Sequence, residues 1–319
     1  MTKIYFAPME GITDYVFRRV HHRHFGGVEK YFIPFLSPTH SLTFSTRERN
    51  DVLPQNNTGV PAVPQILTNN PDYFLNVASW LSDLGYTELN LNLGCPSGTV
   101  TAKRKGSGLL RYSDLLRALL DGIYAHSQLP VSIKTRIGYE STEEWAGLVD
   151  IYKQYPVHEM IIHPRTRMEF YNGTPHSELC SVLPFPFIYN GDIFSAVDCD
   201  SLRKDLPCTA GFMLGRGLVA NPALAQTIND SETLNRESLI SFHDDLYREY
   251  LETWPESAAV GKMHLLMKYF SSCFENGYKV LRSLRKVTTC EEYENVVYPL
   301  FREQPMRSNP AFRLDLLLS

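Results

Sequence analysis

Small and polar residues able to bind a ligand recur along the chain, each close to the end of a short apolar run. Lysine and histidine side chains bind anionic or polar groups, and glycine lets the main chain approach a phosphate closely. The recurrence therefore indicates a site for a phosphorylated cofactor. The residues are Ala7, Pro8, Met9, Gln65, Asn92, Lys134, His163, Asn190, Gly191, Asp192, Gly215 and Arg216.

Cys95 is the candidate for chemistry on a substrate. It lies between Gly94 and Pro96, just after an apolar run, which is a position typical of an exposed thiol. An unperturbed thiol has a pKa of roughly 8.5, so it is mostly protonated near neutral pH and can donate a proton as well as attack. No histidine is its neighbour in sequence, and we favour the proton donor over the nucleophile. The structural alternative is a small apolar filler.

Lys134 and His163 each have a structural alternative as well. Lys134 alternates with Ile133 and Thr135, as a surface lysine on an edge strand would. A strand buried on both faces would instead bury the ammonium, which then needs an anionic or strongly accepting partner. His163 follows a run of buried type and could be a core histidine. The sequence alone leaves both alternatives open.

The apolar runs predict eight strands separated by helices long enough for parallel crossovers. This pattern favours a (β/α)8 TIM barrel, in which the carboxyl ends of all strands meet at one mouth. The last two strands of such barrels are commonly followed by a phosphate site, which here falls on 190–192 and 215–217. The expected strands are 4–7, 28–34, 61–67, 87–93, 131–136, 159–163, 187–189 and 211–214, and the expected helices are 14–22, 72–84, 113–125, 142–155 and 195–203.

Beyond residue 235 the strand pattern stops, and helical patterns cover 238–253, 260–276, 277–286 and 291–318. We therefore predict a barrel domain over 1–235 and a small all-helical domain over 236–319. The chain of 319 residues has a net charge of −4, so only a local basic patch could hold a polyanion. Lysines and arginines between 261 and 290 form one such patch, to which Arg18, Arg19, Arg23 and 103–105 could add. A solvated helix face is the alternative.

Other function classes are excluded by composition. No apolar run approaches the roughly 18–20 residues of a membrane span, and the N-terminus has no signal-like pattern. The six cysteines form no Cys-x-x-Cys pair, so neither a zinc site nor a disulfide framework is expected. We expect a cytoplasmic protein with reduced thiols.

Taken in order, these motifs resemble those of the tRNA-dihydrouridine synthases, from about Tyr5 to 222. The resemblance implies FMN on a TIM barrel, a helical RNA-binding domain, and NADPH as the reductant that recharges the flavin. It further implies reduction of the C5–C6 double bond of specific uridines in tRNA, with hydride passing from reduced FMN to C6 and a proton from Cys95 to C5. Two positions depart from the family pattern, namely Pro164, where glycine is usual, and Gly98, where many members have lysine.

The resemblance also implies a role for each site residue, with Cys95 catalytic and no metal. It implies tRNA as the partner, no protein partner and a monomer. Two alternatives remain at this point: a flavin barrel acting on a free dihydropyrimidine or dihydroorotate, and an RNA-binding protein without catalysis. The expected cofactor residues are Ala7, Pro8, Met9, Gln65, Lys134, His163, Asn190, Gly191, Asp192, Gly215 and Arg216. The expected substrate residues are Asn92, Arg165, Tyr171, Arg282, Arg285 and Lys286.

Overall fold

The computed structural model describes residues 1–40, 43–181, 183–307 and 310. Its centre is a parallel sheet whose strand order runs β3-β2-β1-β9-β8-β7-β6-β5-β4. Pro64, which has no N–H to donate, separates β3 from β4, so the two are one interrupted strand that closes the sheet into an eight-stranded barrel. The predicted TIM barrel is confirmed. The strands are β1 (Lys3–Phe6), β2 (Lys30–Phe32), β3 (Ala62–Val63), β4 (Gln65–Ile66), β5 (Leu89–Leu93), β6 (Val131–Gly138), β7 (Met160–Thr166), β8 (Phe187–Tyr189) and β9 (Thr209–Leu214).

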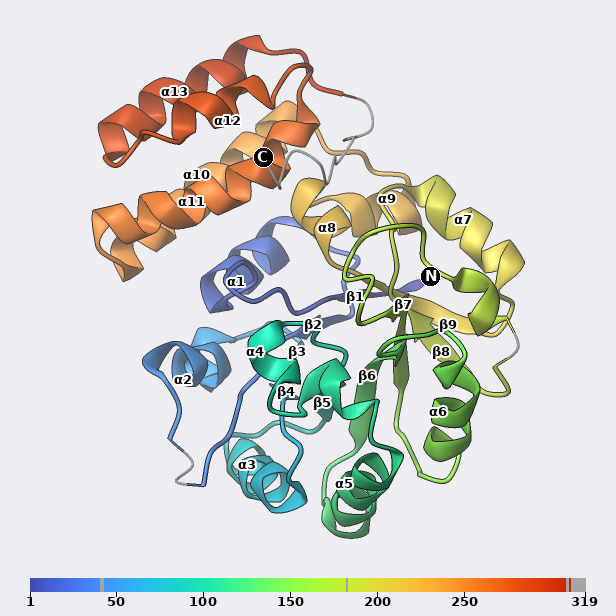
Figure 1. Cartoon of the computed structure of the whole chain (residues 1–319). Helices are drawn as coiled ribbons and strands as arrows, with labels where there is room; N and C mark the ends of the chain where they lie inside the picture. The colour runs from blue at the N-terminus through green and yellow to red at the C-terminus, as the bar shows by residue number, and fades with distance from the viewer. Residues whose placement is uncertain (41–42, 182, 308–309, 311–319) are drawn as a thin grey trace.

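Helices surround the barrel (Figure 1). Those expected from the sequence lie within a few residues of their predicted ranges, whereas α2, α4, α8 and α9 were missed. Ser45 and Glu48 form a capping box at the start of α2, a signal that the sequence does contain. The helices around the barrel are α1 (Tyr15–His24), α2 (Thr46–Val52), α3 (Pro71–Asp83), α4 (Gly98–Thr101), α5 (Ser113–His126), α6 (Glu144–Tyr152), α7 (Ala196–Asp205), α8 (Arg216–Ala220) and α9 (Leu224–Asp230).

Successive side chains on a strand point to opposite faces, and the barrel uses this alternation to separate two environments. Ile4 and Phe6 of β1 belong to the large apolar cluster that includes many helix residues. Tyr5 and Ala7 belong to a small second cluster with residues of other strands. Lys134 lies in β6, which is paired on both sides with β5 and β7, so the edge-strand alternative for this lysine is wrong.

The C-terminal region is helical, and Figure 1 shows it against the side of the barrel that carries α1 and α8. Asn235 caps its first helix through a capping box with Ser238. The predicted helix over 291–318 ends at Glu303, and 311–319 lie outside the described residues. Within the described residues, no helix is both long and apolar enough to cross a membrane. The four helices are α10 (Arg236–Thr253), α11 (Glu256–Phe270), α12 (Lys279–Leu284) and α13 (Cys290–Glu303).

Ion pairs hold this helical region on α1. Arg19 and Arg23 both bond to Glu249 of α10, at 2.6 and 2.7 Å. Lys262 of α11 pairs with Asp14, the residue that caps α1. Arg19 and Arg23, expected to extend the basic patch, and Lys262, expected within it, therefore form ion pairs inside the protein.

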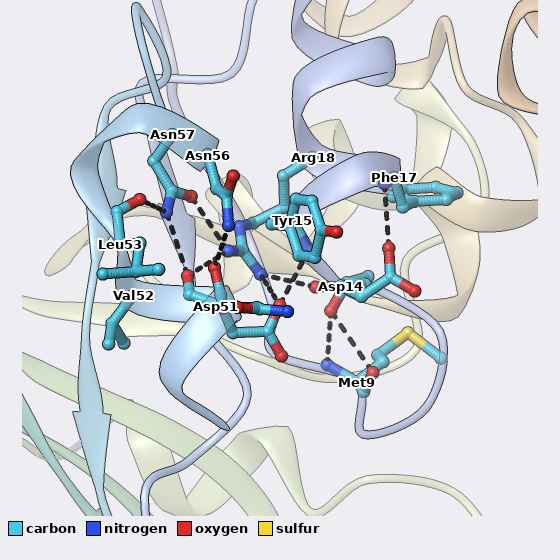
Figure 2. A network of polar contacts seen from close by, with 12 residues as sticks. Met9, Asp14, Tyr15, Phe17, Arg18, Asp51, Val52, Leu53, Asn56 and Asn57 are labelled. Carbon is cyan, nitrogen blue, oxygen red and sulfur yellow. Dashed lines mark hydrogen bonds and ion pairs between the residues drawn. The ribbon is translucent and has the colours of Figure 1, made fainter. Parts of the chain in front are cut away.

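Arg18 is fully buried beside this junction rather than available to RNA. Figure 2 shows its guanidinium next to Asp51 and Asn57, with Asp14 and Met9 close by. It donates to the carbonyl of Asp51 at 2.7 Å and to the amide oxygen of Asn57 at 2.9 Å. Burial is the main cause that raises the pKa of Asp51 to about 6, even though Arg18 opposes it. The network supports the turn that carries Met9 toward the mouth of the barrel.

Candidate active site

A cavity of about 310 Å³ opens at the carboxyl ends of the strands. Its wall contains all of the expected cofactor residues except Gln65. Such a volume is at the lower end of the range for ligand pockets. The lining residues are Ala7, Pro8, Met9, Lys134, His163, Tyr171, Asn190, Gly191, Asp192, Ile193, Phe194, Gly215, Arg216, Gly217 and Tyr269.

Lys134 contributes its amino group to the wall of the cavity. Among the described residues no carboxylate pairs with its ammonium. Burial, reinforced by the neighbouring Arg136, lowers the pKa of Lys134 to about 7. A partly buried ammonium without a partner is costly, so this position is suited to an anionic or strongly accepting group of a ligand.

His163 is neutral and oriented. Burial, together with the charges of Arg136 and Lys134, lowers its pKa well below the usual value. Its Nε2 lies 3.1 Å from Nη1 of Arg165, and since a guanidinium only donates, Nε2 must accept. The proton is therefore on Nδ1, which can donate to a ligand. The core-histidine alternative is wrong, because His163 lines the cavity.

The loops after β8 and β9 meet closely enough to form a main-chain cradle. A side chain at Gly217 would place its Cβ 2.1 Å from the carbonyl oxygen of Ile193, so only glycine permits this approach. At Gly215 a Cβ would lie 3.4 Å from Ala7 and from the sulfur of Met9. Gly191, Gly215 and Gly217 line the cavity, so the main chain of both loops can approach a ligand such as a phosphate.

Asp192 does not make the cradle negative, because two arginines neutralise it. Arg165 donates to both carboxylate oxygens, at 2.6 and 3.2 Å, and Arg216 donates to one of them. The three side chains together carry an excess positive charge. This cradle and the unpaired Lys134 fit the phosphate and the polar ring of a flavin mononucleotide.

Cys95 follows β5, the neighbour of the strand that carries Lys134. Its N–H donates to Oδ1 of Asn92 at 2.9 Å, and its carbonyl oxygen accepts from Oγ of Ser107 at 2.8 Å. Burial is the main cause that raises the pKa of the thiol, while Arg136 and Lys134 oppose the increase. The thiol is therefore protonated at neutral pH, as a proton donor must be.

Asn92 and Gln65 use their amides inside the barrel. Asn92 donates to Oε1 of Gln65, which donates to Oδ1 of Asn90, both at 2.7 Å. The side-chain amide of Asn90 in turn donates a hydrogen bond to Oγ of Ser132 at 2.9 Å. Neither Gln65 nor Asn92 lines the cavity, and Oδ1 of Asn92 also holds the N–H groups of Gly94 and Cys95. The side-chain amides of Gln65 and Asn92 each use one N–H in these bonds and have a second N–H available. The predicted contact of Gln65 with the cofactor and that of Asn92 with the substrate stay predictions.

Arg165, expected to contact substrate, is placed beneath the site instead. Its side chain is 0% exposed, and it also donates to the carbonyl oxygens of Asn172 and Gly173. With the bonds to His163 and Asp192, every N–H of its guanidinium has an acceptor. Arg165 therefore supports the cradle and the loop after β7 and has no donor left for RNA.

Tyr171, by contrast, lines the cavity and is 46% exposed. The guanidinium of Arg216 lies 4.8 Å from its ring centre. Tyr269 of α11 also lines the cavity, so the helical region completes its wall. The sequence shows Tyr269 only as a helix residue, because its place depends on how α11 docks on α8.

The structure does not bring Arg282, Arg285 and Lys286 to the cavity. They are exposed on and just after α12, which packs against α11 and α13. Within the described part of the chain, no group of histidine, cysteine and acidic residues is placed to hold a metal ion.

Comparisons with known proteins agree with this geometry. The profile of the Dihydrouridine synthase (Dus) family matches residues 5–303. The chain is 24% identical over 313 residues to the tRNA-dihydrouridine(16) synthase of Aquipseudomonas alcaligenes, covering 92% of this chain and 98% of that protein. It is 32% identical over 259 residues to the probable tRNA-dihydrouridine synthase 2 of Bacillus subtilis, covering 76% and 78%. The structure of morphinone reductase has the same fold, with a TM-score of 0.51 at 10% identity over 73% of this chain and 87% of that one.

Proposed function

The chain belongs to the dihydrouridine synthase family, and from this premise we propose how its own residues reduce uridine in tRNA. It is a flavin-dependent oxidoreductase that forms dihydrouridine in tRNA. The match covers nearly the whole chain, including α10 to α13, so the alternatives of a free pyrimidine substrate and of a silent RNA-binding protein are not supported.

The cofactor is FMN in this proposal, with NADPH as its reductant. When bound, the flavin supplies hydride to C6 of the uracil. Lys134 and the Nδ1–H of His163 bind polar atoms of the cofactor, and Asn190, Gly191 and Gly215 contribute to the phosphate cradle. The support is the amino group of Lys134, which has no carboxylate partner among the described residues and shares the cavity with Gly191, Gly215 and Gly217.

Cys95 donates the proton that uracil C5 needs. The S–H bond breaks, its proton forms the new C5–H bond, and the sulfur keeps the electron pair as a thiolate. The positive charges of Arg136 and Lys134 oppose the rise in thiol pKa, so they stabilise the thiolate that results. Solvent then returns a proton to the sulfur. Asn92 and Ser107 hold the backbone of Cys95 in place for this transfer.

Residues 236–319 serve as the tRNA-recognition domain in this proposal, with Arg282, Arg285 and Lys286 facing the polyanion. The target base has to leave the stacked tRNA to reach the cavity, and contacts elsewhere on the RNA offset that cost. We place the reaction in the cytoplasm and expect the protein to act as a monomer.

The observation that carries this proposal is the position of the Cys95 thiol, two residues past the end of β5, which pairs with the strand that carries the unpaired Lys134. The test is mass-spectrometric mapping of dihydrouridine in tRNA from cells that have, lack, or express a Cys95→Ala form of the protein. We expect the wild type to restore dihydrouridine, and Cys95→Ala to lower turnover by about 10²–10⁴-fold while keeping the flavin absorbance. Unchanged turnover in Cys95→Ala would remove Cys95 from the proton step.

A further inference from the structure

The loop after β7 exposes large apolar side chains beside the cavity. Met168 is 53% exposed, Phe170 38% and Tyr171 46%, and the three lie within four consecutive residues. Tyr171 also lines the cavity, so the exposed patch is continuous with the active site. An exposed apolar cluster at the rim of a site indicates a surface that contacts a partner.

The backbone of Phe170 adopts an unfavourable conformation. Its φ is +52°, in the left-handed region that large side chains rarely adopt. Such conformations persist only where the surroundings impose them, and they concentrate at functional sites. Here Glu169 accepts bonds from the N–H of Thr166 at 2.6 Å and pairs with His176, also at 2.6 Å. Arg165 fixes the far side of the loop through Asn172 and Gly173.

The imposed conformation places Phe170 at the end of an alternating column of arginines and aromatic rings. The guanidinium of Arg111 lies 4.7 Å from the ring centre of Tyr139, and that of Arg167 lies 5.4 Å from the same ring. Arg167 lies 4.6 Å from the ring of Phe170. The Nε of Arg167 is buried without a hydrogen-bond partner. Glu140 pairs with Arg111 at 2.9 Å, whereas Arg167 has no carboxylate partner in the described part of the chain.

We propose that Arg111, Tyr139, Arg167 and Phe170 form a stacking platform for an unpaired base of the tRNA next to the target uridine. Aromatic faces stack bases of any sequence, and arginines add cation–π and phosphate contacts. Removing the target uridine from the stack leaves its neighbour without a stacking partner, and the platform supplies one at the rim of the cavity. The inference rests on the proposed function, because it takes tRNA as the substrate.

The test uses Phe170→Gly, which removes the ring while relieving the backbone. Because glycine accepts a positive φ, this variant should unfold at the same temperature as the wild type or a higher one. We expect its KM and Kd for tRNA to rise about tenfold, as the loss of one stacked base does. Flavin absorbance and flavin reduction by NADPH should stay at wild-type values.

Matched variants separate the loss of stacking from the change in backbone and the loss of apolar surface. Ser231 also has a positive φ, of 60°, at the end of α9, so Ser231→Gly makes the same backbone change without removing a ring and should leave tRNA binding unchanged. Phe170→Tyr should keep the affinity, whereas Phe170→Leu, which is apolar but has no aromatic face, should lose it.

Three outcomes would overturn the platform. One is wild-type tRNA affinity in Phe170→Gly, and another is full affinity in Phe170→Leu. The third is a change in oligomeric state in place of a change in tRNA affinity, which would show that the loop contacts a second copy of the chain. In each case an active wild-type enzyme leaves the proposed function intact, whereas absence of dihydrouridine formation by the wild type contradicts that function itself.

Discussion

Two lysines at opposite ends of the barrel show how the same side chain serves two purposes. Lys30 begins β2 at the end away from the mouth, with its Nζ 2.6 Å from Glu88 and 3.0 Å from Glu159. Burial opposes its charge, but the two carboxylates outweigh burial and raise the pKa of Lys30. Lys134, near the mouth, has no carboxylate partner among the described residues, and its pKa falls to about 7. The far end of the barrel neutralises its lysine internally, and the mouth leaves Lys134 available to pair with a ligand.

The contrast between the two lysines predicts opposite stability effects for the same substitution. Lys30→Met removes the ammonium that lies between Glu88 and Glu159 and should lower the free energy of unfolding by about 3 kcal/mol. Lys134→Met removes a partly buried amine that has no carboxylate partner among the described residues, and it should raise the free energy of unfolding of the flavin-free protein by about 1–3 kcal/mol. Urea denaturation of the two flavin-free variants measures both effects.

The variant that loses stability should retain the cofactor, and the variant that gains stability should lose it. Lys30→Met is expected to keep FMN, because its contacts lie at the far end of the barrel, whereas Lys134→Met should lose it during purification. Equal losses of stability in the two variants would contradict the difference between a paired Lys30 and an unpaired Lys134. Retention of FMN by Lys134→Met as tight as in the wild type would contradict it as well.

A smaller effect is expected at the surface, where charges are screened by solvent. Replacing Arg282, Arg285 and Lys286 together by glutamine should weaken tRNA binding by about tenfold at physiological salt and reduce its salt dependence. Filter binding at several salt concentrations measures both quantities, and flavin reduction by NADPH serves as the control. An unchanged salt dependence would show that α12 and the residues after it do not face the RNA.

The amino-acid sequence was sufficient to predict the barrel and most of the cavity wall. Strands and helices differ in the period of their apolar residues, so the sequence pattern indicates where each strand ends. Because the carboxyl ends of the parallel strands of a barrel meet at one mouth, the residues that follow them are grouped there. Such residues include Met9, Lys134, His163 and Gly215. Pro164 does not disturb this grouping, because it lies within β7 and its carbonyl accepts from the N–H of His176.

Side-chain partners and helix docking could not be predicted in the same way. The supporting role of Arg165 has no local signal, because four of its five bonds go to carbonyl groups of the loop after β7 and to Asp192 after β8, which only the fold brings to the guanidinium. Lys262 has the charge expected of an RNA patch, but the docking of α11 places it against Asp14. The docking of α11 also brings Tyr269 to the cavity. These positions depend on contacts between distant segments, which local periodicity does not encode.

The central claim is that an unpaired Lys134 binds an anionic part of the cofactor, and proton uptake on FMN binding tests it most directly. At pH 8 the free ammonium, with its pKa of about 7, is mostly deprotonated, and an anionic partner should raise that pKa. FMN affinity should therefore be greatest below about pH 7 and weaken as the pH rises. Calorimetry at pH 8 in buffers of different ionisation enthalpy should show proton uptake by the wild type and none by Lys134→Arg, whose charge is permanent. Equal uptake by the two proteins, or no uptake by the wild type, would contradict the account.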